Sequence, residues 1–247
     1  MRKELFEARE VAGHAVWQSG TIGIDLHEGF AMKIHDKLPD APRSPIYLSL
    51  RPDGVKGGKL QPGHLDKIGF AMSLMAIQQG GLFKLGTQTW VAGIPAAGEP
   101  ILEAMIRATG PRRSKRILSF KLKKEEDANG RRIAGIHTDY DGIVPNDEHD
   151  ELVLVDDLMS NMETKVEAVS AVQRYGANVS TILLFLDRSV RGIDKLRTNY
   201  GIRTLAVWEF NQLLEFGLGN GYLTRTVYEK IIEYPIQLET YKDQQAT

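Results

Sequence analysis

Cysteine is absent from the 247 residues of this chain. Its absence excludes disulfide bonds, thiolate nucleophiles and thiolate metal sites, and it fits a protein of a reducing compartment. An excess of one charge is also missing, because 31 Lys and Arg residues against 32 Asp and Glu residues leave a net charge of −1. That balance argues against general binding to nucleic acid or to a membrane surface. We therefore expect no nucleic acid and no membrane among the partners.

Long apolar stretches are missing as well. No run approaches the roughly 18 residues that a membrane helix needs, and acidic side chains interrupt the apolar residues near the N-terminus, unlike a signal peptide. These features predict a cytoplasmic protein. Metal-ligand spacing such as HExxH is absent too, so surface or structural roles are favoured for the histidines, which are His14, His27, His35, His64, His137 and His149.

What is present is an alternation of strand-like and helix-like segments. The expected strands are 89–93, 116–122, 133–141, 152–155, 179–186 and 202–207, and the expected helices are 5–17, 65–79, 100–109, 162–175, 192–199, 209–216 and 222–234. Such an order predicts an α/β fold with a parallel sheet and right-handed crossovers. We divide the chain into an N-terminal helix and hood (1–64), a core (65–220) and a C-terminal helix and tail (221–247).

Residues 152–164, LVLVDDLMSNMET, carry the chemistry of the chain. A continuous apolar strand delivers Asp156 and Asp157 at its carboxyl end, and a short polar loop leads into a helix. Two carboxylates there can contact ribose hydroxyls or hold Mg²⁺, and a helix N-terminus offers backbone N–H groups to a phosphate. The alternative interpretation is that the paired acids cap the next helix and do nothing else.

This segment resembles the phosphoribosyl pyrophosphate motif of type I phosphoribosyltransferases. Four further segments, in the right order, are similar to orotate phosphoribosyltransferase in particular. They are SPIYLSLR at 44–51, VAGIPAAGEPI at 91–101, LLFLDRSVRGIDKL at 183–196 and GIRTLAVWEFNQLLEF at 201–216. The resemblance implies a Rossmann-like parallel sheet flanked by helices with a small N-terminal hood.

The resemblance also implies an activity and a role for each matching residue. The family binds the magnesium complex of phosphoribosyl pyrophosphate and displaces pyrophosphate with a ring nitrogen of a base, here most simply orotate. Asp156 and Asp157 match the ribose-binding acids and would hold Mg²⁺ weakly, with Asp157 also catalytic. The other implied positions are Ser160, Asn161 and Thr164 for the 5′-phosphate, Ala96, Ala97 and Gly98 for pyrophosphate, Lys123 and Lys124 for catalysis, and Lys33 and Arg188 for the base.

Each of these assignments has an alternative interpretation. Arg188 could form a surface ion pair with Asp187, and Lys33 could be one exposed lysine among many. The small residues 96–98 could simply make a tight turn into a helix. The charged residues 123–132 could be the solvated tip of a loop.

Two segments depart from the family pattern. In the phosphate loop, Met162 and Glu163 stand where the family has glycines. Side chains there restrict the backbone conformations that aim N–H groups at a phosphate. In the loop expected to close over pyrophosphate, Asp127 and Asn129 replace a lysine and a histidine, which removes positive charge; Arg131 and Arg132 would compensate if the register slips.

Three hypotheses follow from this pattern. The first is an active phosphoribosyltransferase for orotate, working as a homodimer as is common in that family. The second is a catalytically degenerate relative that acts as a nucleotide or base sensor, or as a partner-binding module. The third is an active enzyme for another acidic base, such as a nicotinate-like acid.

Overall fold

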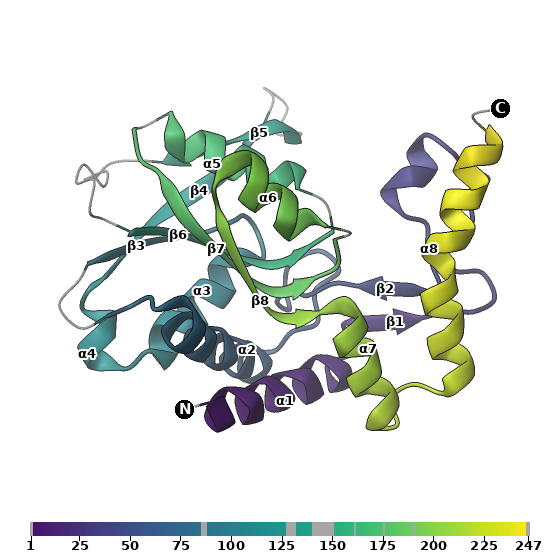
Figure 1. Ribbon diagram of the computed structural model, residues 1–247, viewed down its shortest axis with the longest axis horizontal. Coiled ribbons are helices and arrows are strands. Elements are labelled where there is room, and N and C mark those ends of the chain that lie inside the picture. Colours follow the sequence, from purple (N-terminus) through teal and green to yellow (C-terminus); the bar gives the residue numbers. More distant parts are fainter. Residues whose placement is uncertain are drawn as a thin grey trace.

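The structure of the chain is a computed structural model that describes residues 2–84, 88–126, 132–139, 151–160, 162–174, 176–189 and 191–245. Its centre is a sheet with the strand order β5-β4-β3-β6-β7-β8 (Figure 1). The strands are β3 (Thr89–Gly93), β4 (Ile117–Glu126), β5 (Arg132–Asp139), β6 (Glu151–Met159), β7 (Val179–Asp187) and β8 (Arg203–Glu209). All neighbouring strands are parallel except β5, which pairs antiparallel with β4 at the edge. The α/β fold expected from the sequence is confirmed.

Helices cover both faces of the sheet. One face packs against α1 (Arg2–Gln18), α2 (Pro62–Met75), α3 (Gly98–Ala108) and α7 (Phe210–Gly219). The other face packs against α5 (Glu163–Gln173) and α6 (Gly192–Tyr200). A π-helical turn, η2 (Ala76–Gly80), extends α2, and a short helix, α4 (Pro111–Ser114), follows α3. Helices on both faces explain why the central strands read as continuous apolar runs.

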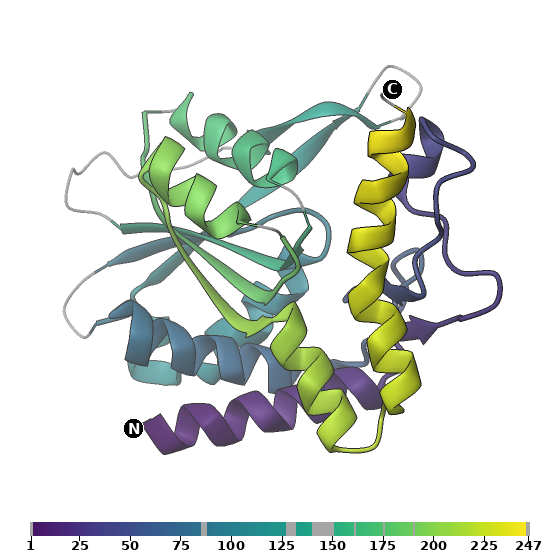
Figure 2. The same cartoon turned by 45° about the vertical axis from the view of Figure 1, so that its right-hand side comes forward.

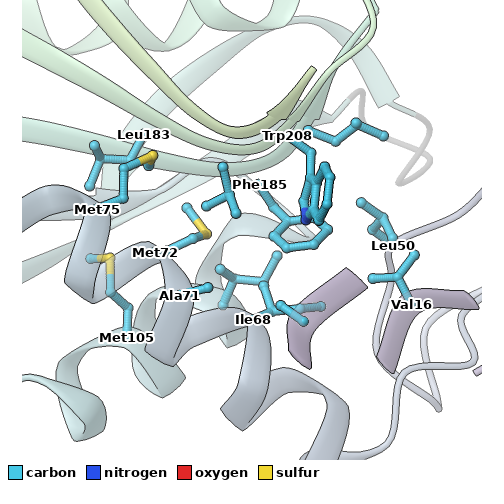
Figure 3. Close-up of a cluster of buried hydrophobic side chains, with 14 of the residues drawn as sticks. Val16, Leu50, Ile68, Ala71, Met72, Met75, Met105, Leu183, Phe185 and Trp208 are labelled. Atoms are coloured by element: carbon cyan, nitrogen blue, oxygen red, sulfur yellow. The ribbon is translucent and has the colours of Figure 1, made fainter. Parts of the chain in front are cut away.

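Strand β6 shows how one strand contributes to both cores. Val153 and Val155 belong to the cluster beneath α2 and α3, whereas Leu152 and Leu154 belong to the cluster beneath α5 and α6. All four are buried, because successive side chains of a strand point to opposite faces. Figure 3 shows the first cluster, in which side chains of α2 such as Met72 and Met75 meet Leu183 and Phe185 of the sheet.

The N-terminal third adds a small hood to this core. It holds a two-stranded antiparallel sheet of β1 (Ile22–Ile24) and β2 (Ile46–Leu48), and a short 3₁₀ helix, η1 (Lys33–Asp36). The last helix, α8 (Arg225–Gln245), runs alongside the hood in both views (Figures 1 and 2). The domain boundaries at 64 and 220 stay predictions.

Element lengths differ from the expectation at three places. Strand β6 continues to Met159 because its hydrogen bonding with β7 continues to Asp187, so Asp156 and Asp157 lie within the strand and not after it. Strand β4 continues to Glu126 because it pairs with β5, so the expected loop begins later than residue 123. Helix α8 reaches Gln245, beyond the expected end at 234.

The strand order creates a topological switch point between β3 and β6. From β3 the chain first builds outward to β4 and β5, and then returns to place β6 on the other side of β3. The connections after β3 and β6 therefore leave in opposite directions. In open α/β sheets, ligands bind in the crevice at the carboxyl ends of the strands at such a switch point.

Candidate functional site

The carboxyl end of β6 brings two acids to the switch point. The Asp156 side chain is buried and the Asp157 side chain is half-buried. One oxygen of Asp156, Oδ1, accepts the backbone N–H of Asp157 at 2.9 Å, and Oδ1 of Asp157 accepts the N–H of Leu158 at 2.7 Å. These bonds fix the direction of both carboxyl groups.

A buried lysine forms an ion pair with the second carboxylate oxygen of Asp156. Lys165, in the first turn of α5, places its Nζ 2.6 Å from Asp156 Oδ2, and both side chains are less than a tenth exposed. The same Nζ donates to the carbonyl oxygen of Leu158 at 2.5 Å. Protein donors therefore hold both oxygens of Asp156. Of the two acids, Asp157 is the one better placed to contact a ligand.

Asp157 has an unusual electrostatic environment. Its burial raises its pKa well above the ordinary value of 3.8, and the negative charge and hydrogen bond of Asp156 raise it further. The Lys165 ammonium and the Leu158 N–H oppose this shift with smaller effects. A carboxyl beside a like charge favours its protonated form.

The loop after β3 crosses closely over the end of β6. The backbone N–H of Ile94 donates to the Val155 carbonyl at 2.8 Å, and Gly98 begins α3. A side chain at Gly98 would place its Cβ 2.3 Å from the Val155 carbonyl oxygen, so only glycine fits. This contact draws the loop of Ala96 and Ala97 against the acid pair.

These elements enclose a cavity of about 880 Å³ at the switch point. Its lining comes from the loop after β3, the end of β6, the first turns of α5, strand β4, and strand β2 with the hood segment that follows it. Of the predicted site residues, the cavity brings together Ala96, Ala97, Lys124, Asp156, Asp157, Ser160 and Thr164.

The two predicted catalytic lysines lie differently. Lys124 lines the cavity and is half-buried, whereas its neighbour Lys123 is exposed and is not among the lining residues. Strand alternation explains the difference, because Lys124 shares a face of β4 with the buried Leu122 and Lys123 takes the opposite face.

Arg188 lies outside this cavity. Its backbone N–H donates to the Met159 carbonyl at 2.8 Å, and it lines a second pocket between α5 and α6. Its guanidinium stands 5.1 Å from the centre of the Phe210 ring. Burial lowers the pKa of Arg188 below its ordinary value, an effect that nearby Tyr234 of α8 opposes. The structure does not bring Arg188 together with the acid pair.

Some predicted positions fall outside the described residues. Asn161, Asp127, Asn129 and the side chain of Lys33 are among them, although the backbone of Lys33 begins η1. Within the described residues, no three acidic or histidine side chains gather where they could hold a metal ion. Nor does any described helix have the length and apolarity to cross a membrane.

The residues of the cavity that were missed from the sequence include Tyr47, Ser49, Arg51, Lys165 and Glu167. A signal for Lys165 was present, since it shares the i, i+3, i+4, i+7 spacing of Ala168, Val169 and Val172, which face the core. A lysine in the first turn of a helix is also unfavourable to the helix dipole. Both features indicate a buried anionic partner.

The fold is the type I phosphoribosyltransferase fold. Similar solved structures include the UMP synthase of Leishmania donovani, with a TM-score of 0.63 and 23% identity over 93% of this chain and 42% of that chain. Another is the orotate phosphoribosyltransferase of Mycobacterium tuberculosis H37Rv in complex with phosphoribosyl pyrophosphate, with a TM-score of 0.53 and 17% identity over 84% and 92% of the two chains.

The similar curated sequences are orotate phosphoribosyltransferases. The chain is 30% identical over 82 residues to a curated orotate phosphoribosyltransferase of Pyrobaculum calidifontis, and the match covers 33% of this chain and 42% of the relative. The matched segment thus spans less than half of the relative's length. No family model matches the chain. The resemblance to type I phosphoribosyltransferases, and to orotate phosphoribosyltransferase among them, is confirmed.

Replacing Lys165 by Met tests the buried ion pair. We expect the free energy of unfolding to fall by about 3–5 kcal/mol, because Asp156 would be left buried and without its cation. The double variant Lys165→Met/Asp156→Leu should recover most of that loss, and Lys67→Met on the exposed face of α2 should change stability by less than about 0.5 kcal/mol. Urea unfolding measures all three. Equal effects of Lys165→Met and Lys67→Met would contradict the ion pair.

The raised pKa of Asp157 predicts a pH-dependent effect of Asp157→Asn. A carboxyl whose pKa is raised by folding stabilises the fold below its unfolded pKa, and that contribution is lost as pH rises through its folded pKa. Asparagine cannot ionise. The free energy of unfolding of the variant minus that of the wild type should therefore increase as pH rises from the ordinary value of 3.8, and then level off. Urea titrations across a pH series measure it, and a constant difference would refute the shift.

Proposed function

We propose that the protein is a phosphoribosyltransferase that transfers the 5-phosphoribosyl group of phosphoribosyl pyrophosphate to orotate. In this reaction a ring nitrogen of the base forms a bond to C1 of the ribose, the bond from C1 to pyrophosphate breaks, and the base loses its N–H proton. The products are a nucleotide and pyrophosphate. The observation that carries the proposal is the single cavity that joins the acid pair, the first turn of α5, the loop 96–97 and Lys124.

Each wall of the cavity suits one part of the substrate. Asp157 would bind the ribose hydroxyls, since Lys165 already engages Asp156. The first N–H groups of α5 have no acceptor within the helix, so together with Ser160 and Thr164 they would bind the 5′-phosphate. The loop at Ala96 and Ala97 would lie along the pyrophosphate, whose charge Lys124 would neutralise.

Magnesium fits this arrangement as a companion of the substrate. With both Asp156 oxygens engaged by protein donors, Asp157 is the carboxyl of the pair that would approach the ion, and the phosphate oxygens of the substrate would supply further ligands. When bound, Mg²⁺ neutralises charge on the leaving pyrophosphate. A homodimer, in which the loop after β4 closes the partner's site, is part of the same proposal and follows from the resemblance alone.

One observation favours the second candidate, a catalytically degenerate relative that senses a nucleotide or base. Lys165 neutralises one of the two acids, and Met162 and Glu163 occupy the turn into α5. Such a site would still bind a phosphoribosyl compound while turning over slowly or not at all. Turnover therefore separates the two candidates.

The paired lysines of β4 provide the test. Purified protein with Mg²⁺, phosphoribosyl pyrophosphate and orotate should release pyrophosphate. Lys124→Gln should lower kcat about 10²–10³-fold, as removal of a group that stabilises transition-state charge does, and Lys123→Gln should change it little because that side chain points away from the cavity. Loss of activity in Lys123→Gln alone would contradict the assignment, and a wild type without turnover would favour the sensor.

A further inference from the structure

The last helix, α8, is anchored to the rest of the chain at its start. A hydrogen bond of 2.9 Å joins the Tyr222 hydroxyl, just before the helix, to Nδ1 of His14 in α1. The Tyr222 ring also stacks on Trp17, with 5.6 Å between the ring centres. Leu223 and Ile231 follow in the core, where they are 5% and 2% exposed. The first half of α8 is therefore fixed to α1 and to the core beneath the sheet.

The second half of α8 is held less firmly. Pro235 lies inside the helix and has no N–H to donate to the Ile231 carbonyl, so the helix is weakest at this point. Beyond the proline, Ile236 is 68% exposed, and Leu238 and Tyr241 are only half-buried. The helix thus consists of an anchored half and, after Pro235, a half that can move as a unit.

Arg188 is close to Tyr234, the residue of α8 that immediately precedes the proline. Burial lowers the pKa of Arg188 and raises that of Tyr234, and each side chain opposes the shift of the other. The Phe210 ring centre lies 5.1 Å from the same guanidinium. Within the part of the chain that the structure describes, no carboxylate forms an ion pair with Arg188. A partly buried cation without an anion is costly, so an anionic ligand would be a favourable partner for it.

The pocket that holds Arg188 adjoins the cavity of the acid pair. Ser160, Glu163 and Glu167 line both spaces. A long side chain in one space therefore reaches toward the other by changing its rotamers, once the groups that cover it move aside. In Figure 2, α8 stands between the sheet and the hood, so its second half is placed to control that change.

We propose that α8 is an autoinhibitory strap: Tyr234 holds the Arg188 guanidinium against Phe210 in the pocket between α5 and α6, and movement of residues 236–245 about Pro235 releases it to an anion in the cavity of the acid pair. This inference rests on the proposed function, because it concerns regulation of the same site. The segments that resemble orotate phosphoribosyltransferase end at residue 216, so the resemblance assigns α8 no role. A ligand that binds the released arrangement better would shift the protein toward it.

Two probes test the strap. Orotidine 5′-monophosphate carries a ring carboxylate, whereas ribose 5-phosphate lacks the base altogether. Calorimetry on the whole chain would give the affinity of each probe for the wild type and for Tyr234→Ala, Tyr234→Phe and Pro235→Ala. Tyr228→Phe is the matched control, because Tyr228 lies in the anchored half and packs against the core.

Tyr234→Ala should raise the affinity for orotidine monophosphate about 5- to 10-fold, within the range of allosteric couplings, and Tyr234→Phe should act in the same direction by less. Pro235→Ala allows the hydrogen bond to Ile231, holds the strap more firmly and should lower that affinity about 3- to 5-fold. Tyr228→Phe should change neither affinity, and ribose 5-phosphate should bind every variant equally. In an Arg188→Gln background, the gain from Tyr234→Ala should vanish.

Hydrogen exchange gives a readout that a purely structural helix would not show. Orotidine monophosphate should speed the exchange of backbone amides in residues 236–245 of the wild type about tenfold or more, because the strap is released, and should leave residues 226–233 unchanged. Ribose 5-phosphate should change neither segment.

Several results would overturn the strap. A gain from Tyr234→Ala that persists in the Arg188→Gln background would show that α8 does not act through Arg188. Weaker binding to Tyr234→Ala, in a protein with the wild-type melting temperature, would make Tyr234 part of the binding site and not its inhibitor. Binding of both probes with equal affinities in all variants refutes this inference and leaves the proposed function standing, whereas a wild type and variants that bind neither probe refute both.

Discussion

The buried ion pair between Lys165 and Asp156 is the interaction on which the geometry of the site depends. It joins the carboxyl end of β6 to the first turn of α5 at 2.6 Å, and thereby sets how closely the strand approaches the helix N-terminus. The pair also distinguishes the two acids. Protein donors engage both oxygens of Asp156, and Asp157, whose pKa burial and the charge of Asp156 raise, is the acid that we propose contacts the ligand. Removing either partner would leave a buried charge alone.

The sheet places this pair where a ligand can reach it. Because the chain reverses its direction of growth between β3 and β6, the loop at Ala96 and Ala97 and the acid pair face each other across one crevice. The close approach of Gly98 to the Val155 carbonyl holds that loop down. The hood closes the opposite side with Tyr47, Ser49 and Arg51. Segments distant in sequence thus meet at one cavity.

Local patterns predicted much of the fold and part of the site. Apolar runs such as 152–155, alternating with segments of helical spacing, were sufficient to predict the parallel sheet. They also predicted that Asp156 and Asp157 lie near the carboxyl end of a strand, although the strand continues past both acids. Contacts between residues distant in the sequence could not be predicted from local patterns. The burial of Lys165 depends on where α5 packs against the sheet. The length of β6 depends on its pairing with β7. The placement of Arg51 depends on the packing of the hood. Sequence order also gave no sign that Arg188 lines a second pocket, between α5 and α6.

Calorimetric titration of phosphoribosyl pyrophosphate with Mg²⁺ into the wild type and Asp157→Asn tests the central claim most directly. The claim is that Lys165 reserves Asp156 for structure and leaves Asp157 as the acid that binds ribose. Micromolar binding to the wild type, weakened at least about tenfold in the variant by the loss of hydrogen bonds to a charged or acidic group, is the predicted result. Equal binding to both proteins, or no binding to the wild type, would contradict it.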